Sequence, residues 1–176
     1  MLFLLFQIGN DRYALEARHA VEVVPLLALK KIPHASRGVA GIFNYRGRPV
    51  AAVDLCELTF GRPARELLST RIIVVNFTDS AGKPQWLGLI AEHATGMIRR
   101  EERDFVRSGV KVGNAPYLGP VVMDDQGVIQ LLHAEHLLTE TVRNLLFDET
   151  RAIVAPELGA RPETTEASAT QADTAP

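Results

Sequence analysis

The residues that could do chemistry in this chain are few and scattered. His133 and His136 stand three positions apart, so a helix would place both imidazoles on one face, where they could share a metal ion. Glu135 stands between them, but no His/Asp/Glu motif nearby supplies the third ligand, and we interpret them as ordinary residues at the start of a helix. Cys56 is the only cysteine, and its apolar neighbours Leu55 and Leu58 indicate a buried structural thiol rather than a nucleophile.

Sequence motifs of common enzyme classes are missing as well. The chain has no GxxxxGK[ST] phosphate loop, no GxGxxG turn after a strand and no GxSxG nucleophile elbow. The acids Asp124 and Asp125 fall in a predicted turn, where aspartate is favoured because it hydrogen-bonds to the backbone. We therefore expect no catalytic residue, no bound metal and no cofactor.

The residues most informative about binding gather at a predicted hairpin tip. Asn44, Tyr45, Arg46 and Arg48 surround Gly47 there. An arginine guanidinium beside an aromatic ring is typical of an anchor in a protein interface. A solvated tip without any function is the alternative that the residue types leave open.

Strands must position this tip, because short apolar and β-branched runs separated by turn signals dominate the chain. The predicted strands are 2–8, 12–16, 21–24, 39–45, 48–54, 71–77, 86–91, 94–98, 117–123 and 128–132. A capping box from Asp54 to Glu57 predicts a short helix, and apolar spacing predicts a longer one over 133–147. Many short strands without alternating long helices predict a mainly β fold of two small barrels in tandem, covering about 1–65 and 66–132.

Charge and composition narrow the function further. Lys and Arg number 19 against 21 Asp and Glu, so the chain lacks the basic excess typical of nucleic-acid binding. Local arginine clusters keep that alternative open as a minor one; they are Arg46 with Arg48, and Arg99, Arg100 and Arg103. No apolar run is long enough for a signal peptide or a membrane span, which predicts a cytoplasmic protein without direct membrane insertion.

The end of the chain differs in composition from the rest. Between 155 and 176 four acidic residues face one basic residue, and no aromatic residue occurs. Such a segment cannot bury enough apolar surface to offset its ordering entropy. We predict a disordered acidic tail over 150–176.

Taken in order, several segments resemble the CheW-like domain of bacterial chemotaxis coupling proteins. The matching segments are Phe6-x-x-Gly9, Glu22-Val23, Gly41 to Gly47 with its Asn-x-Arg-Gly element, Val53-Asp54-Leu55, Arg71 to Val75 and Leu87 to Ile90. The resemblance covers about 3–138. Tyr45 departs from the family pattern because leucine is usual at this position.

The resemblance implies one CheW-like domain over 1–149, with two five-stranded SH3-like β-barrel subdomains packed together and a C-terminal helix over 133–149. It implies a non-catalytic adaptor that joins the signalling tip of a methyl-accepting chemoreceptor to the regulatory domain of a CheA-type histidine kinase. The adaptor would act at membrane-associated receptor arrays, in a chemotaxis pathway or a related surface-sensing or pilus pathway.

Carried over by position, the resemblance places receptor-binding residues on the hairpin tip. Asn44, Arg46 and Gly47 belong to the Asn-x-Arg-Gly element, and Tyr45 and Arg48 complete the tip. Glu22 and Val23 would lie on the strand that borders the groove between the barrels. The alternative from another class is a small-molecule-binding barrel or a cryptic enzyme, which would need polar groups converging in a pocket.

Overall fold

The computed structural model describes residues 1–78, 82–107 and 115–138, and within these ranges most of the regular secondary structure is β-strand. The strands are β1 (Leu2–Ile8), β2 (Asp11–Glu16), β3 (Ala20–Pro25), β4 (Val39–Tyr45), β5 (Arg48–Asp54), β6 (Arg71–Thr78), β7 (Pro84–Arg99), β8 (Leu118–Asp124) and β9 (Gly127–Leu132). Helix α1 (Leu55–Phe60) follows β5, and short 3₁₀ turns occupy Ala17–His19, Glu102–Asp104 and Ala134–His136.

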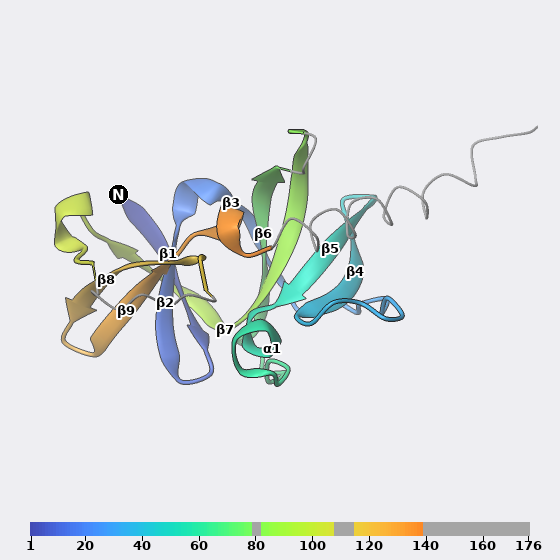
Figure 1. Ribbon diagram of the computed structural model, residues 1–176, viewed down its shortest axis with the longest axis horizontal. Helices are drawn as coiled ribbons and strands as arrows, with labels where there is room; N and C mark the ends of the chain where they lie inside the picture. The colour runs from blue at the N-terminus through green and yellow to red at the C-terminus, as the bar shows by residue number, and fades with distance from the viewer. Residues whose placement is uncertain (79–81, 108–114, 139–176) are drawn as a thin grey trace, which may run out of the picture.

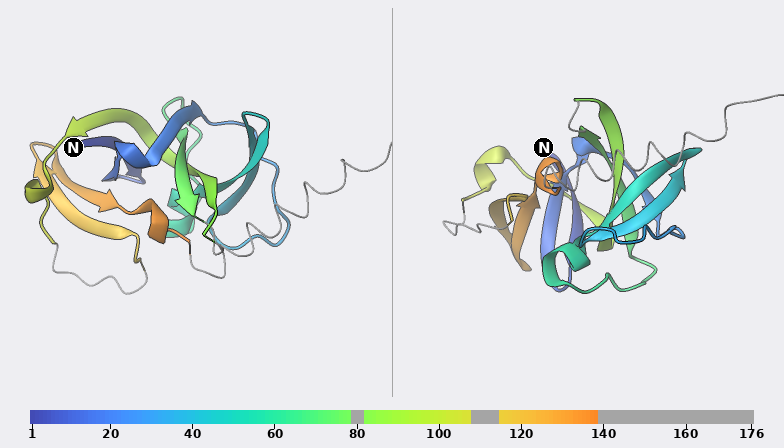
Figure 2. Two further views of the ribbon diagram at one scale, coloured as in Figure 1. Left: turned by 90° about the horizontal axis from the view of Figure 1, so that it is seen from above. Right: turned by 45° about the vertical axis from the view of Figure 1, so that its right-hand side comes forward.

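The strands form two five-stranded sheets that share β7. One sheet has the order β7-β1-β2-β9-β8, and the other has the order β3-β6-β7-β5-β4. Figure 1 shows the first sheet on the left and the second on the right, with β7 running between them, and Figure 2 shows the same separation from two other sides. The expected mainly β architecture of two five-stranded subdomains is confirmed.

In sequence, the strands β3 to β6 of the second sheet lie between the two parts of the first sheet, β1–β2 and β8–β9. This order differs from the expected division near residue 65. β1 and β2 lie in the same sheet as β8 and β9, because β2 pairs in parallel with β9. β3, β4 and β5 lie with β6, because β5 pairs in parallel with the first part of β7. Local sequence patterns predict each strand, but they carry no information on these two long-range parallel pairings.

The two strands predicted at 86–91 and 94–98 are one continuous strand, β7. Its first part pairs with β6, and its second part pairs with β1. The polar residues Glu92 and His93 mark the change from one sheet to the other. There the pairing with β1 shifts register, and His93 has a positive φ of 48°.

Strands that are apolar on both faces separate three cores. Within the second sheet, Ile72 and Val74 of β6 contact one core, whereas Ile73 and Val75 face a larger core between the sheets. A third core lies inside the first sheet. Because successive side chains of a strand point to opposite faces, a continuous apolar run is what a doubly covered strand requires.

Helix α1 begins where the capping residues predicted it. The Asp54 carboxylate accepts hydrogen bonds from the backbone N–H groups of Cys56 and Glu57 at 2.9 and 3.1 Å, and the helix ends at Gly61 with a φ of 72°. Within the described ranges no helix is long and apolar enough to span a membrane. Of the predicted helix over 133–149, the structure describes 133–138, where Ala134–His136 forms a 3₁₀ turn and no α-helix is present. The residues from 139 on, including the predicted acidic tail, lie outside the described residues.

Candidate protein-binding site

The tip of the β4–β5 hairpin is a two-residue turn. Arg46 and Gly47 have φ values of 51° and 78°, the left-handed pair that a tight hairpin turn of type I′ requires. Asn44 supports the turn, because its Oδ1 accepts a hydrogen bond from the Gly47 N–H at 2.8 Å. The Asn-x-Arg-Gly element therefore fixes a backbone shape that projects Arg46 into solvent, where its side chain is 64% exposed.

The Glu22 carboxylate joins β3 to this hairpin. Its Oε2 accepts a hydrogen bond from the Tyr45 hydroxyl at 2.5 Å and another from Arg46 Nη2 at 2.8 Å. The hydrogen bond from Tyr45 lowers the pKa of Glu22 and raises that of the tyrosine, and the charge of Arg46 lowers the pKa of Glu22 further. The anionic carboxylate is therefore the stable form in this cluster.

The cluster closes the second sheet. β3 and β4 are its two end strands, and among the described residues neither pairs with the other. The hydrogen bonds of Glu22 bridge this opening near the hairpin tip. Farther along β4, the segment that follows β3 pairs with the strand, because Lys30 and Ile42 exchange backbone hydrogen bonds of 2.8 Å. Gly41 permits this approach, because a Cβ there would lie 2.5 Å from the Lys30 carbonyl oxygen.

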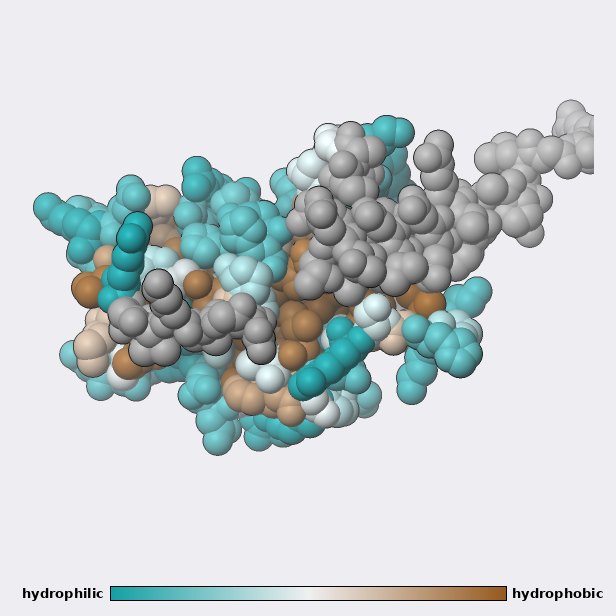
Figure 3. Space-filling model, viewed as in Figure 1, coloured by the Kyte–Doolittle hydropathy of each residue, from teal (hydrophilic) through white to brown (hydrophobic). Residues whose placement is uncertain are grey.

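The predicted site residues do not all gather in one place. Glu22, Tyr45 and Arg46 are in contact, with Asn44 and Gly47 beside them. Val23 lies on the other face of β3, where its side chain is exposed together with that of Val21. β3 therefore presents a polar contact to the hairpin and an apolar face to solvent. Figure 3 shows one face of the molecule, on which apolar residues reach the surface near the middle and hydrophilic residues occupy most of the outline.

Arg48 belongs to a second cluster on the side of the hairpin that faces β7. Its guanidinium carbon lies 5.6 Å from the centre of the Trp86 ring, and the Tyr45 and Trp86 rings meet edge to face with centroids 5.0 Å apart. The sequence reasoning missed Trp86, which is the only tryptophan of the chain. The signal that could have found it is its place in a long apolar strand, where a bulky ring with a polar edge suits a partly exposed position.

A buried carboxylate at the junction of the two sheets was also missed. Glu92 is fully buried, and it accepts hydrogen bonds from the backbone N–H of Arg65 at 2.7 Å and from Arg65 Nη2 at 2.8 Å. Burial alone would raise the pKa of Glu92, but the hydrogen bonds from Arg65 and the charges of Arg65 and Arg62 lower it to about 2. This ion pair anchors the segment after α1 to the middle of β7.

The residues considered for metal or thiol chemistry form no reactive site. The rings of His133 and His136 are 6.1 Å apart, but the parts of the chain that the structure describes hold no group of three or more potential metal ligands. Cys56 is a buried free thiol whose pKa is raised, mainly by burial. Burial of the Cys56 thiol agrees with its interpretation as a structural residue.

The described part of the chain thus consists of two barrel-like sheets with an ordered arginine-bearing hairpin at one edge. A sequence model of the CheW-like domain family matches residues 2–142. The chain belongs to the CheW-like domain family, which confirms the resemblance read from the sequence.

Individual relatives agree with this assignment. The chemotaxis protein CheW of Helicobacter pylori is 30% identical to the chain over 103 residues, which are 58% of this chain and 59% of that protein. The crystal structure of the scaffolding protein TtCheW from Thermoanaerobacter tengcongensis is similar in fold, with a TM-score of 0.69 and 22% identity. That match covers 78% of this chain and 87% of the solved one.

Proposed function

We propose that this protein is a non-catalytic adaptor that couples the signalling tip of a methyl-accepting chemoreceptor to a CheA-type histidine kinase. The observation that carries the proposal is the ordered hairpin tip, in which the Asn-x-Arg-Gly element holds Arg46 exposed beside Glu22. Family membership over residues 2–142 supports it, as does the similarity to a chemotaxis protein CheW.

The receptor would contact the hairpin tip and the adjacent exposed face of β3. Arg46 offers an ionic contact on the Glu22 side of β3, and the exposed side chains of Val21 and Val23 offer apolar contacts on its other face. A helix lying across the edge of β3 could use both, because an amphipathic helix carries apolar anchors and charges on neighbouring positions. Glu22 holds Arg46 in one direction before the partner arrives, which lowers the entropy lost on binding. Single contacts of this kind are weak, and repetition in an array supplies the remaining strength.

The other expected partner is the regulatory domain of the kinase, which the family resemblance implies. We place the protein in the cytoplasm, recruited to receptor arrays at the membrane. The same architecture serves a swimming pathway or a surface-sensing or pilus pathway. Co-purification from the native cell, followed by identification of the receptor and kinase recovered, separates these pathways.

Charge reversal at Arg46 tests the proposal directly. We expect Arg46→Glu to weaken capture by the cytoplasmic fragment of the co-purifying receptor by more than about 1 kcal/mol, which is about fivefold or more. The reversal also places a second carboxylate beside Glu22. Binding is measured by pull-down and by titration calorimetry with the purified fragment.

The matched control is Arg103→Glu, which makes the same charge change at an exposed arginine in the 3₁₀ turn Glu102–Asp104, between β7 and β8. It should leave receptor capture within experimental error of the unchanged protein. Equal binding by Arg46→Glu, with a circular dichroism spectrum and thermal midpoint like those of the control, removes Arg46 from the receptor site.

A further inference from the structure

We propose that the cavity between Arg48 and Trp86 is a binding site for a carboxylate attached to an apolar or planar group. The site adjoins the Glu22 contact through Tyr45, whose ring packs against Trp86 and whose hydroxyl donates to Glu22, but Arg46 and Glu22 do not line the cavity. The proposal therefore does not depend on the proposed receptor binding. It would give the protein a ligand in addition to its macromolecular partners.

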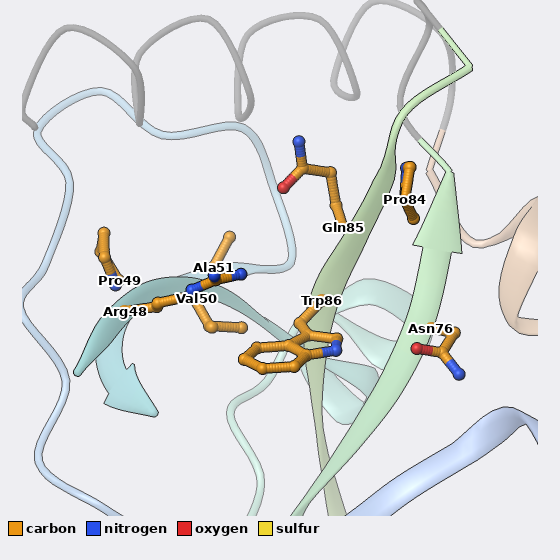
Figure 4. A pocket seen from close by; sticks show the side chains of 8 residues that line it. All are labelled: Arg48, Pro49, Val50, Ala51, Asn76, Pro84, Gln85 and Trp86. Carbon is orange, nitrogen blue, oxygen red and sulfur yellow. The ribbon is translucent and has the colours of Figure 1, made fainter. Parts of the chain in front are cut away.

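The cavity has a volume of about 280 Å³ and is formed by three neighbouring strands. Its lining residues are Arg48, Pro49, Val50 and Ala51 of β5, Asn76 of β6, and Pro84, Gln85 and Trp86 of β7. Figure 4 shows Trp86 in the middle, with the β5 residues on one side and Asn76 on the other. An apolar wall with a few convergent polar groups is the usual composition of a small-ligand site.

The charge of the lining favours an anion. Arg48 is the only charged residue among the eight, and none of them carries a carboxylate. Three other arginines, Arg12, Arg46 and Arg65, each pair with an acidic side chain. Within the described ranges Arg48 forms no ion pair, and its guanidinium lies over the Trp86 ring. Its fork of N–H groups is therefore available for a carboxylate, which matches guanidinium geometry with two parallel hydrogen bonds.

The neighbourhood holds these groups in place before a ligand arrives. The Tyr45 ring packs edge to face against Trp86, and Tyr45 itself is buried and tied to Glu22. Pro49 and Pro84 restrict the backbone on either side of the cavity. A preformed site loses little entropy on binding, so even a small ligand can be held.

The volume sets the size of the ligand. At about 280 Å³ the cavity is near the lower limit of small-molecule pockets. A ring or branched side chain can lie against Trp86 while its carboxylate reaches Arg48. Two sources offer this chemistry: a free small acid, and the C-terminal carboxylate of a peptide whose last residue is apolar.

The indole of Trp86 reports on the cavity without added labels, because the chain has a single tryptophan. We would titrate the full chain with benzoate and, as a neutral isostere, with benzamide, exciting the indole at its red edge to avoid ligand absorbance. We expect saturable quenching by benzoate with a Kd of about 1 mM, and a Kd at least about tenfold weaker for benzamide, which lacks the charge-assisted hydrogen bonds.

The peptide source is tested in parallel with acetyl-Phe-Leu bearing either a free carboxylate or a C-terminal amide. The free-carboxylate peptide should bind more tightly than its amide. If it also binds more tightly than benzoate, the site selects peptide C-termini; if benzoate binds more tightly, the site selects free small acids. Both results support a carboxylate site.

Variants separate this site from the receptor contact. Arg48→Gln should weaken benzoate binding about tenfold or more, whereas Arg46→Gln should leave it within about twofold, because Arg46 points to Glu22. Thermal midpoints check that both variants fold. The proposal is overturned if benzoate and benzamide bind equally, if no saturable signal appears, or if Arg48→Gln binds benzoate like the unchanged protein. None of these results bears on receptor capture, which depends on Arg46.

Discussion

Glu92 and Glu22 both pair with an arginine, but the two ion pairs differ in almost every other respect. Glu92 is fully buried at the junction of the two sheets, where it accepts hydrogen bonds from the side chain and the backbone N–H of Arg65. Glu22 lies at the edge of the second sheet, with a side chain that is 41% exposed and an arginine partner that is more exposed still. Both have a lowered pKa, so both are anionic at neutral pH.

The difference suggests two uses for the same chemical pair: stability of the fold for the buried one and, in the function proposed above, recognition for the exposed one. A buried carboxylate that loses its partner cannot regain water, so its ion pair must stay formed. An exposed pair exchanges its partner for water or for another protein at small cost. We therefore assign Glu92 to the stability of the junction and Glu22 to the preparation of a binding surface.

Removing each carboxylate in turn should give the largest measurable difference between Glu92 and Glu22. We expect Glu92→Ala to lower the free energy of unfolding by about 3 kcal/mol, because it leaves the Arg65 backbone N–H without its acceptor and opens a space in the junction. Glu22→Ala should change stability far less, because both of its partners reach solvent or can do so after a small movement. Urea unfolding of both variants measures the difference, and equal losses would contradict the assignment.

The dependence of stability on acid pH should show a smaller effect of the buried carboxylate. The pKa of Glu92 is lowered to about 2, and the pKa of Asp124 is also lowered to about 2 by its hydrogen bonds from Arg12. A carboxyl group with a lowered folded-state pKa stabilises the fold above its ordinary pKa and loses that contribution as protons bind. Stability should therefore fall as pH drops from about 5 to about 2.

The variant Glu92→Gln isolates the share of the buried pair. It keeps the size of the side chain but cannot titrate, so its urea midpoint should fall less steeply over this pH range than that of the unchanged protein. A slope equal to that of the unchanged protein would assign the acid sensitivity to Asp124 and other carboxylates instead.

The smallest expected effect concerns the hydroxyl of Tyr45. Tyr45→Phe removes the hydrogen bond to Glu22 but keeps the ring that packs against Trp86. We expect the pKa of Glu22 to rise toward its ordinary value, measured by carboxyl-carbon NMR, and receptor binding to weaken about two- to fivefold. An unchanged titration of Glu22 would mean that Arg46 alone holds the carboxylate.

The strands were predictable because their signals are local. The hairpin at Val39–Tyr45 and Arg48–Asp54 appears with the expected bounds, since apolar runs on either side of Arg46-Gly47 specify both strands and the turn. Asp54 likewise predicted the start of α1. The pairing of β2 with β9 was not predictable, because it joins residues more than a hundred positions apart without any local mark.

The candidate site was predictable in part for the same reason. The residues of the hairpin tip stand together in the sequence, and Glu22 entered through the family resemblance alone. Trp86 and the Glu92–Arg65 pair are brought to their places by strand pairing across long separations. These residues form no distinctive sequence motif, so their roles can be recognised only once the structure shows which residues surround them.

The sharing of β7 by both sheets has a mechanical consequence. Sixteen residues run without interruption from one sheet into the other, a contour of roughly 50 Å at the rise of an extended chain. The apolar core between the sheets and the Glu92–Arg65 pair clamp the strand at the point where a hinge would otherwise form. If two proteins bind at opposite ends of the molecule, as the proposed coupling role requires, this shared strand would hold them at a fixed spacing and angle.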